Sequence, residues 1–392
     1  MKVTLGEIAT LINGDRGKNY PSQEDISSSG EVPFVNAGHL NGREIEFSDM
    51  NYISLEKYNS LNSGKFTTGD ILYCLRGSLG KKAIVGDEVK GAIASSLVII
   101  RPNPTFIKSE YLMLALDSSD IHEQLAMANN GSSQPNLSAA SIRNFSIDLP
   151  DLTEQTEITQ ILQKVRSTID AYTQQLLALD TLIKARFIEM FGGGKYRTVK
   201  AAEVCDFITK GTTPPTDEIV FEYETGLIPF LKVYNLSFTG ELLFDAEPQY
   251  IPATIHNGKL ARSKVYPNDV LMNIVGPPLG KFSLVTNEFA EWNINQAIAI
   301  FRSQNDVLPR YLLAALMQPK VLGPFVEQAV GIRQLNLSLE QCRNLEFPLP
   351  PIAEQVRFVE FSAQVDKSKV VVQKALDEAQ LLFDSLMQKY FG

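Results

Sequence analysis

The chain has 392 residues, of which 44% are apolar and 21% charged, as is typical of a globular protein with room for two or three domains. No apolar run reaches the roughly 18 residues of a membrane-spanning helix, and the 3 cysteines are too few and too scattered for a disulfide framework or a zinc site. The formal net charge of −9 argues against a broad phosphate-binding surface, so nucleic acid could bind only at a local patch.

The first segment, residues 1–148, is expected to fold as a mixed α/β domain. Its first residues lack the apolar core of a secretion signal, which predicts a cytoplasmic protein without a membrane partner. Helical spacing occurs at residues 108–128. Short segments rich in Val, Ile and Phe predict strands at Val32–Val35, Ala83–Val85 and Leu97–Ile100.

The next segment, residues 149–192, predicts a single long helix. Neither Pro nor Gly occurs between the Leu-Pro that opens it and the Phe-Gly that closes it. About 39 helical residues would span roughly 58 Å at 1.5 Å per residue. Apolar residues at spacings of four and three form a heptad seam, at Ile158, Leu162, Val165, Ile169, Tyr172, Leu176, Leu179 and Ile183.

The second half of the chain repeats the first after a Gly-rich linker, residues 193–195. A second mixed α/β domain is expected at residues 196–348 and a second long helix at residues 349–392. The Leu-Pro, Glu-Gln and Phe-Gly landmarks of the two helices recur at a constant offset of 200. A strand is expected at Ile298–Phe301, as in the first half. The two helices are therefore expected to pair with each other.

Two further features of the repeat matter for structure and function. The segment Gly-x-x-Gln-x-Asn-Leu-Ser occurs in both halves, and Ser138 and Ser338 at its ends are expected to cap short helices. The same segment also brings a Gln to a turn, where it could reach nucleic-acid bases. In the second helix, Lys369 interrupts the apolar seam at the position of Ile169, and we expect the helix pairing to be weakest there.

Enzyme motifs are missing from the sequence. It contains no phosphate-binding G-x-x-x-x-G-K-[S/T] loop, no H-E-x-x-H metal motif and no G-x-S-x-G nucleophile elbow. The three histidines, His39, His122 and His256, are isolated from one another along the sequence. No acid, base or nucleophile cluster is duplicated with the repeat, which favours a protein that is not an enzyme.

Taken together, the duplicated landmarks resemble the specificity (S) subunit of type I restriction-modification systems. The resemblance rests on the Leu-Pro-x-x-x-Glu-Gln helix starts at Leu149–Gln155 and Leu349–Gln355, on the Gly-Asp-Ile-Leu turn that begins at Gly69, and on the two Gly-x-x-Gln-x-Asn-Leu-Ser segments. It covers essentially all 392 residues. The order, duplication and spacing of these motifs carry it together.

The resemblance implies an α+β fold in which two mixed α/β target recognition domains are joined by two long helices. These helices would form an antiparallel coiled coil and give the chain a pseudo-twofold internal repeat. Each domain would read one half of a bipartite site in the major groove of double-stranded DNA, and the helix pair would set the spacer. Two methyltransferase subunits and motor/nuclease subunits would be the protein partners. The cofactors S-adenosylmethionine, ATP and Mg²⁺ would be bound by those partners, and none by this chain.

Base readers are usually Arg, Lys, Asn and Gln, with help from Ser and Thr. The candidates in the first half are Arg16, Lys18, Asn19, Tyr20, Asn36, His39, Arg76, Ser78, Lys81, Ser133 and Gln134. Those in the second half are Lys210, Thr212, Thr213, Lys232, Tyr234, Asn235, Asn273, Lys281, Asn295, Arg333 and Gln334. For each residue alone, a solvated surface role is an equal alternative.

The main alternative for the whole chain is a non-enzymatic coiled-coil scaffold whose two domains bind proteins. The negative net charge favours this alternative. It predicts no dependence on DNA and no need for a methyltransferase.

Overall fold

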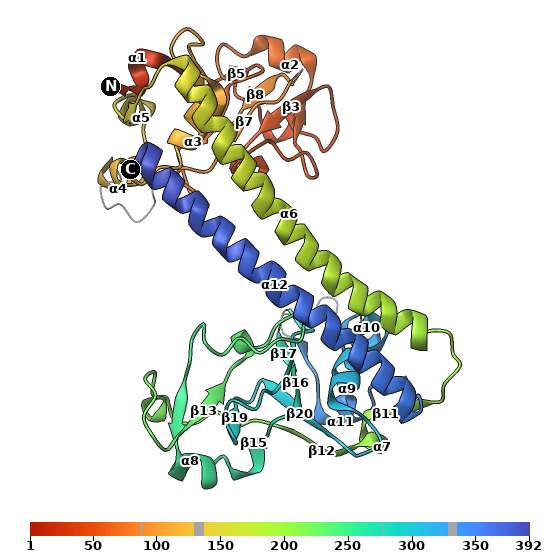
Figure 1. Ribbon diagram of the computed structural model, residues 1–392. Helices are drawn as coiled ribbons and strands as arrows, with labels where there is room; N and C mark the ends of the chain where they lie inside the picture. Colours follow the sequence, from red (N-terminus) through yellow and green to blue (C-terminus); the bar gives the residue numbers. More distant parts are fainter. Residues whose placement is uncertain (88, 129–136, 277, 328–334) are drawn as a thin grey trace. The chain divides into compact units, whose positions relative to one another are not determined.

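The chain divides into two compact units in the computed structural model (Figure 1). Unit 1 comprises Met1–Tyr172 and Ala375–Gly392, and unit 2 comprises Thr173–Lys374. Each of the two long helices therefore contributes residues to both units. The structure describes residues 1–87, 89–128, 137–276, 278–327 and 335–392.

Unit 1 contains the first globular domain, called domain 1 below. Its strands are β1 (Lys2–Thr4), β2 (Ala9–Asn13), β3 (Val32–Val35), β4 (Tyr52–Ile53), β5 (Lys65–Phe66), β6 (Ile71–Cys74), β7 (Lys82–Ile84), β8 (Gly91–Ile93), β9 (Leu97–Pro102) and β10 (Ser146–Asp148). Its α-helices are α1 (Leu5–Ile8), α2 (Leu55–Ser60), α3 (Ser109–Ala115), α4 (Ser119–Ala128) and α5 (Ala139–Arg143). The long helix α6 (Leu152–Phe191) follows.

Two four-stranded sheets form the centre of domain 1. Their strand orders are β2-β9-β6-β7 and β4-β3-β8-β5, and a two-stranded sheet pairs β1 with β10. Alternate residues of β9 point to different cores: Val98 and Ile100 pack with the residues of α3, whereas Leu97 and Ile99 pack against the second sheet. This strand is buried on both faces, which explains its continuous apolar run.

Unit 2 contains domain 2, which repeats this topology. Its strands are β11 (Thr198–Lys200), β12 (Cys205–Lys210), β13 (Leu227–Leu231), β14 (Tyr250–Pro252), β15 (Lys264–Val265), β16 (Val270–Asn273), β17 (Val275–Gly276), β18 (Phe282–Leu284), β19 (Trp292–Ile294), β20 (Ile298–Ser303), β21 (Leu335–Asn336) and β22 (Glu346–Pro348). Its α-helices are α7 (Ala201–Val204), α8 (Ala253–Asn257), α9 (Pro309–Leu316), α10 (Pro319–Glu327) and α11 (Leu339–Arg343), and α12 (Ile352–Phe391) ends the chain.

The sheets of domain 2 have the orders β12-β20-β16-β18 and β14-β13-β19-β15, which match those of domain 1 strand for strand. The predicted internal repeat of two mixed α/β domains is thus confirmed. The segment that follows β9 or β20 forms two helices in each domain, and in domain 1 these are α3 and α4, within the predicted helical region 108–128. In the second half, Pro319 begins α10, whereas Pro324 lies inside that helix. None of the described helices is long and apolar enough to cross a membrane.

A buried ion pair holds the same turn in both domains. The Asp70 carboxylate accepts two hydrogen bonds from the Arg101 guanidinium, at 2.8 and 2.7 Å, and Asp269 accepts two from Arg302 at the same distances. Both aspartates are almost fully buried. The residue before each aspartate has a positive φ, 81° at Gly69 and 75° at Asn268. The Gly-Asp and Asn-Asp turns of the sequence are therefore fixed from inside the domain.

The Glu-Gln landmark of each long helix attaches that helix to its own domain. The Gln155 side chain is fully buried, its Oε1 accepts from the Lys108 N–H at 2.9 Å, and its Nε2 donates to the carbonyls of Phe106 and Pro150. Gln355 makes the corresponding three hydrogen bonds in domain 2. The repeated Gln therefore joins the start of the long helix to the loop before α3 or α9.

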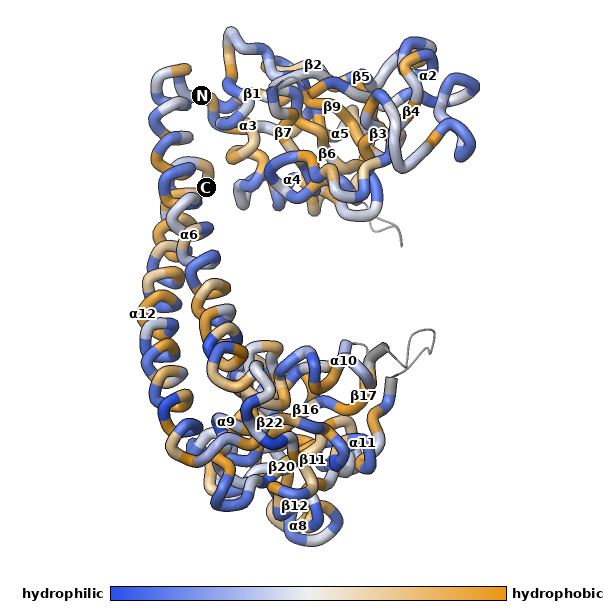
Figure 2. The backbone as a smooth tube through the Cα atoms, turned by 90° about the vertical axis from the view of Figure 1, so that its right-hand side faces the viewer, coloured by the Kyte–Doolittle hydropathy of each residue, from blue (hydrophilic) through white to orange (hydrophobic). Residues whose placement is uncertain are grey.

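Within each unit, the start of one long helix packs beside the end of the other. In unit 1, Ile158 and Leu162 of α6 share a core with Phe391 of α12, whose ring lies 5.2 Å from that of Tyr111. The predicted antiparallel pairing is therefore confirmed in this unit. The seam residues of both helices are buried or half-buried, while the helices alternate hydrophobic and hydrophilic residues along their length (Figure 2).

Unit 2 shows the same arrangement with the roles of the helices exchanged. Phe187 of α6 lies 5.5 Å from Phe358 of α12 and 5.6 Å from Tyr311 of domain 2. The expectation of weak pairing at Lys369 is wrong. Its Nζ bonds Asp180 of α6 at 2.8 Å, so this position carries an ion pair between the helices.

Candidate nucleic-acid interface

A cleft of about 620 Å³ opens in domain 1 where three segments meet. The end of β2 supplies Asn13 and Arg16, and the turn after β6 supplies Arg76. Both arginines are exposed. The cleft is further lined by Leu75, Ala128, Leu137, Ser138, Ala139, Ala140 and Ser141.

The turn after β2 directs its acidic residue inward and its basic residue outward. Asp15 is buried, and its carboxylate accepts hydrogen bonds from the N–H groups of Arg16 at 2.7 Å and Asn62 at 2.6 Å. Gly17 has a φ of 88°, which lets the chain turn sharply after Arg16. Arg16 is thus presented at the cleft while the adjacent carboxylate is bonded inside the domain.

The third wall of the cleft is the segment that carries the repeated Asn-Leu-Ser. The Leu137 N–H donates to the Leu75 carbonyl at 2.9 Å, which ties this segment to the turn after β6. Ser138 caps α5 by accepting from the Ser141 N–H at 2.9 Å, as the sequence predicts. In domain 2 the Ser338 hydroxyl accepts from the Gln341 N–H, so the second predicted cap is also confirmed.

Four further candidates of domain 1 lie at the surface or close to it. Lys18 and Ser78 are exposed, and Asn19 and Lys81 are half-buried. None of them lines the cleft.

The remaining described candidates of domain 1 are engaged within the fold. Tyr20 packs edge-on against Phe34, with ring centroids 5.9 Å apart. The Asn36 side chain accepts from the Gly38 N–H at 2.8 Å. His39 is buried, and burial lowers the pKa of its imidazole. We do not retain these three residues as base readers.

In domain 2, a basic edge forms around the end of β12. Lys210 and Thr213 are exposed, and the Thr212 hydroxyl accepts hydrogen bonds from the Arg262 guanidinium at 3.0 and 3.3 Å. Arg262 is not among the residues predicted from the sequence, although it lies in the basic segment "KLARSK". Nor is Asn13, which directly precedes the Gly-Asp-Arg turn.

Two asparagine candidates of domain 2 are fully buried. Asn235 accepts from the Lys232 N–H at 2.8 Å and donates to the Leu243 carbonyl at 3.1 Å. Asn273 accepts from the Lys281 N–H at 2.8 Å and donates to the Pro278 carbonyl at 2.9 Å. Their amide groups stabilise loops, and neither reaches the surface.

The other candidates of domain 2 differ in exposure and in partners. Lys232 is half-buried, and the Tyr234 hydroxyl is buried with no hydrogen-bond partner among the described residues. The Lys281 Nζ lies 5.7 Å from the ring centroid of Phe238. The Asn295 side chain accepts from the Ala297 N–H at 3.2 Å. Ser133, Gln134, Arg333 and Gln334 lie outside the described residues.

The described residues hold neither a metal-binding cluster nor a reactive cysteine. Within the described ranges, no three His, Cys, Asp or Glu side chains come together as a metal site would require. The three cysteines are buried and free. Burial raises the pKa of Cys74, and raises those of Cys205 and Cys342 to about 12, so none is poised as a thiolate nucleophile.

Comparison with known proteins identifies relatives of the same architecture. The family model described as type I restriction modification DNA specificity domain matches residues 1–180 and 194–379. The EcoBI type I restriction enzyme specificity subunit of Escherichia coli is 26% identical over 286 residues, covering 65% of this chain and 59% of that protein.

Two solved structures share the fold along the whole chain. One comes from work on complex assembly and conformational transition of the type I R-M system, with a TM-score of 0.59 and 20% identity, covering 100% of this chain and 97% of that one. The other is the crystal structure of the type I restriction-modification S subunit from M. genitalium, with a TM-score of 0.55, 14% identity and coverage of 100% and 96%. At these identities the likeness shows the fold.

Proposed function

Since the chain belongs to the family of type I restriction modification DNA specificity domains, we propose that it is the DNA specificity subunit of a type I restriction-modification complex. Each domain would read one half of a bipartite site in the major groove. The helix pair would set the spacer between the half-sites. We place the protein in the cytoplasm, with the DNA that it would read.

The observation that carries the proposal is the duplication of one recognition unit. Each domain has the same two four-stranded sheets, and each is attached to a 40-residue helix through a buried Gln. The two domains differ at their candidate DNA-facing edges. Domain 1 presents Arg16 and Arg76 in a cleft, whereas domain 2 presents Lys210 and Arg262. Two domains with the same fold but different candidate DNA-facing residues are suited to recognising two different half-sites.

The arginines of the domain 1 cleft have the chemistry that base recognition requires. A guanidinium stays charged and can bond the O6 and N7 acceptors of guanine with two parallel N–H groups. Asn13 and the serine hydroxyls of the same cleft could contact other bases or phosphates. We therefore assign base reading in domain 1 to this cleft.

The two methyltransferase subunits would dock on the long helices. Support comes from large exposed apolar side chains of α12: Val370 and Val371 in unit 2 are about 70% exposed, and in unit 1 Leu381 is about 70% and Leu382 50% exposed. Adjacent exposed apolar side chains of this kind suit a protein partner.

The catalytic reactions of the complex would be carried out by the partner subunits. The methyltransferase subunits would bind S-adenosylmethionine, and the motor/nuclease subunits would bind ATP and Mg²⁺. This chain would contribute no catalytic residue. It would bring the reacting base and the methyltransferase together.

The test is to co-express the chain with the methyltransferase of its own system and to map methylated adenines across a genome. A bipartite motif with a fixed spacer is expected. An active complex that methylates a continuous motif would overturn the proposal. The alternative, a protein-binding scaffold, predicts that methylation is unchanged when this chain is omitted.

The same assay tests the domain 1 cleft. Arg76→Ala is expected to relax or weaken one half-site, because a lost bidentate contact costs about 1–3 kcal/mol of discrimination, and to leave the other half-site unchanged. Lys90→Ala, an exposed basic residue of domain 1 outside the cleft, is the matched control. Equal loss at both half-sites, or no loss, would count against the assignment.

A further inference from the structure

Domain 1 is joined to α6 by two ion pairs of defined polarity. Arg43 of the domain bonds both carboxylate oxygens of Asp170, at 2.5 and 3.1 Å. One helical turn earlier, Arg166 of α6 lies 3.9 Å from Asp117 of the domain. Along α6 the helix therefore presents a positive charge at Arg166 and then a negative charge at Asp170. The domain presents a negative charge to the first and a positive charge to the second.

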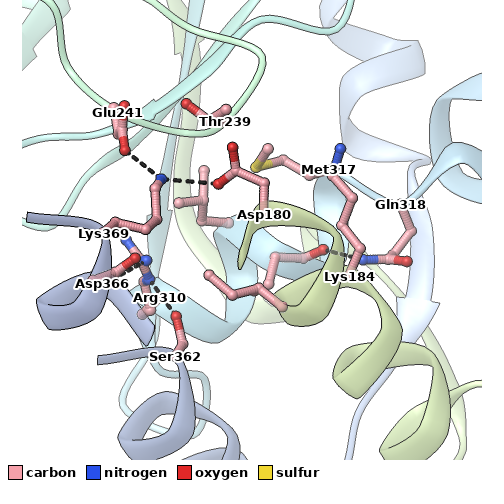
Figure 3. Close-up of a pocket in the computed structure, with 13 residues that line it drawn as sticks. Asp180, Lys184, Thr239, Glu241, Arg310, Met317, Gln318, Ser362, Asp366 and Lys369 are labelled. Carbon is pink, nitrogen blue, oxygen red and sulfur yellow. Dashed lines mark hydrogen bonds and ion pairs between the residues drawn. The ribbon is translucent and has the colours of Figure 1, made fainter. Parts of the chain in front are cut away.

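Domain 2 is joined to α12 by ion pairs of the reverse polarity (Figure 3). Glu241 of the domain bonds the Lys369 Nζ at 2.5 Å. Arg310 of the domain bonds Asp366 of α12 and also donates to the Ser362 hydroxyl at 3.1 Å. Along α12 the helix presents a negative and then a positive charge.

Two members of each set occupy corresponding places in the repeat, whereas Asp117 and Asp170 correspond to Met317 and Val370. Arg166 and Asp366 are related by the offset of 200. Arg43 and Glu241 each follow a glycine with a positive φ, 96° at Gly42 and 88° at Gly240. The equivalent of Arg310 in domain 1 is the acidic residue Glu110. At the two corresponding places, Arg43/Glu241 and Arg166/Asp366, the sign of the charge is therefore inverted between the repeats.

The loops that carry the domain charges are held by their own domains. In domain 1 the Gly42 N–H donates to the Lys82 carbonyl, and the Ile84 N–H donates to the Arg43 carbonyl. In domain 2 the Ser283 hydroxyl donates to the Glu241 carbonyl at 2.7 Å. Because these loops are fixed, a charge on them cannot move far to avoid a repulsive neighbour.

We propose that these residues form a charge key that admits each domain only to the helix of its own repeat, and so fixes the order of the two domains in the chain. The charge key consists of Arg43, Asp117, Arg166 and Asp170 in unit 1 and of Glu241, Arg310, Asp366 and Lys369 in unit 2. Domain 1 placed on α12 would bring Arg43 to Lys369 and Asp117 towards Asp366. Domain 2 placed on α6 would bring Glu241 to Asp170.

The charge key acts mainly by destabilising the wrong pairing of domain and helix. It contributes less to the stability of the correct pairing. Arg43 and Asp170 are 50% and 49% exposed, and such pairs add little stability. Lys369 is only 12% exposed, so a like charge brought to it could not be fully screened by water. Unpaired or repelling charges against the wrong partner are an established source of specificity in proteins.

The experiment tests domain 1 or domain 2 in the second position of the chain, each with the natural helix residues of unit 2 or with the corresponding residues of unit 1. In a chimaera, residues 1–148 replace 197–348, so that domain 1 occupies both positions. The helix pattern of unit 1 is then introduced into unit 2, in the natural chain and in the chimaera. It consists of the four substitutions Asp180→Gln, Asp366→Arg, Lys369→Ile and Val370→Asp, which copy Gln380, Arg166, Ile169 and Asp170.

Urea unfolding of the four chains, followed by circular dichroism, gives the result. The substitutions are expected to lower the unfolding midpoint of the natural chain and to raise that of the chimaera. A shift of the same sign in both chains would overturn the proposal. The measurement uses the chain alone, without DNA, so its outcome does not depend on the proposed function.

A double-mutant cycle in the natural chain covers the case of a chimaera that does not fold. Arg43→Glu is expected to lower the midpoint, and addition of Asp170→Lys to restore it, because the pair is then rebuilt with reversed polarity. Both side chains are half-exposed, so the fold should tolerate the changes. Strictly additive losses would contradict the proposal.

Discussion

Two buried histidines, one in each unit, have both ring nitrogens committed. The Nδ1 of His39 accepts from the Asn36 N–H at 3.1 Å, so its Nε2–H donates to the Asp49 carbonyl at 3.2 Å. In unit 2, the Nδ1 of His256 faces the Asn293 amide at 3.1 Å and its Nε2 faces Glu291 at 3.1 Å. A second proton on either ring would place an N–H against another donor.

These contacts predict that the chain loses stability as the pH falls below about 6.5, the ordinary pKa of His. Burial lowers the pKa of both histidines, against smaller raising effects of Asp49 and Glu291. Between the folded and the ordinary pKa, the unfolded chain binds more protons than the folded chain, so the free energy of unfolding rises with pH. The stabilisation is present above pH 6.5 and is lost on acidification through the folded pKa values.

Denaturant unfolding at pH 7.5, 6.5 and 5.5 measures this dependence. The double variant His39→Asn, His256→Asn is expected to have a flatter profile than the natural chain. His122→Asn is the matched control, because His122 is exposed. A variant profile as steep as the natural one would place the titrating groups elsewhere.

Sequence alone predicts the kinds of residue in the candidate interface but not which of them face solvent. Arg16 and Asn273 were candidates for the same reason, their hydrogen-bonding groups beside a turn. The fold separates them, because Arg16 lines a cleft while the Asn273 amide bonds the loop that starts beside it. Burial depends on contacts between distant segments, and residue type does not reveal it.

At the scale of elements, the long helices were the most predictable part of the chain. The seam and the absence of Pro and Gly predicted both helices, and the structure begins them at Leu152 and Ile352. The role of the repeated Gln was not predictable, because the two partners that attach Gln155 to the domain lie 47 and 49 residues away in the sequence. The ion pair of Lys369 is not predictable for a similar reason: its partner Asp180 belongs to the other helix.

The buried Gln gives a prediction about how each helix is attached to its domain. Gln355→Ala should remove three hydrogen bonds and leave the Leu308 N–H without its partner. Burying an unsatisfied group costs about 1–3 kcal/mol, so the unfolding free energy should fall by about that amount. Hydrogen exchange at the Leu308 amide should accelerate as well.

The control is Gln364→Ala, which removes an exposed Gln side chain from the same helix. It should leave both the unfolding midpoint and the Leu308 exchange rate unchanged. If Gln355→Ala alters stability without faster exchange at Leu308, the Gln stabilises the helix itself and does not attach it to the domain.

At the scale of the whole molecule, the net charge of −9 constrains how the chain can meet DNA. A negative net charge provides no long-range attraction to phosphates, so the proposed binding would rely on the local basic edges and on partner subunits. The negative net charge of the chain is compatible with the proposed DNA role if the recognition domains read bases while the methyltransferase subunits neutralise most of the phosphates.

This division of labour predicts a difference in salt dependence between the chain and its complex. Each neutralised phosphate adds about −0.9 to the slope of log K against log salt. The exposed cations at the described edges are few, namely Arg16, Lys18, Arg76, Lys210 and Arg262. The chain alone should therefore bind its site weakly with a slope no steeper than about −4.5, if each cation meets one phosphate. Fluorescence anisotropy from 50 to 200 mM salt should show a much steeper slope once the methyltransferase is added. Equal slopes with and without it would mean that this chain makes the phosphate contacts itself, through basic residues beyond those five.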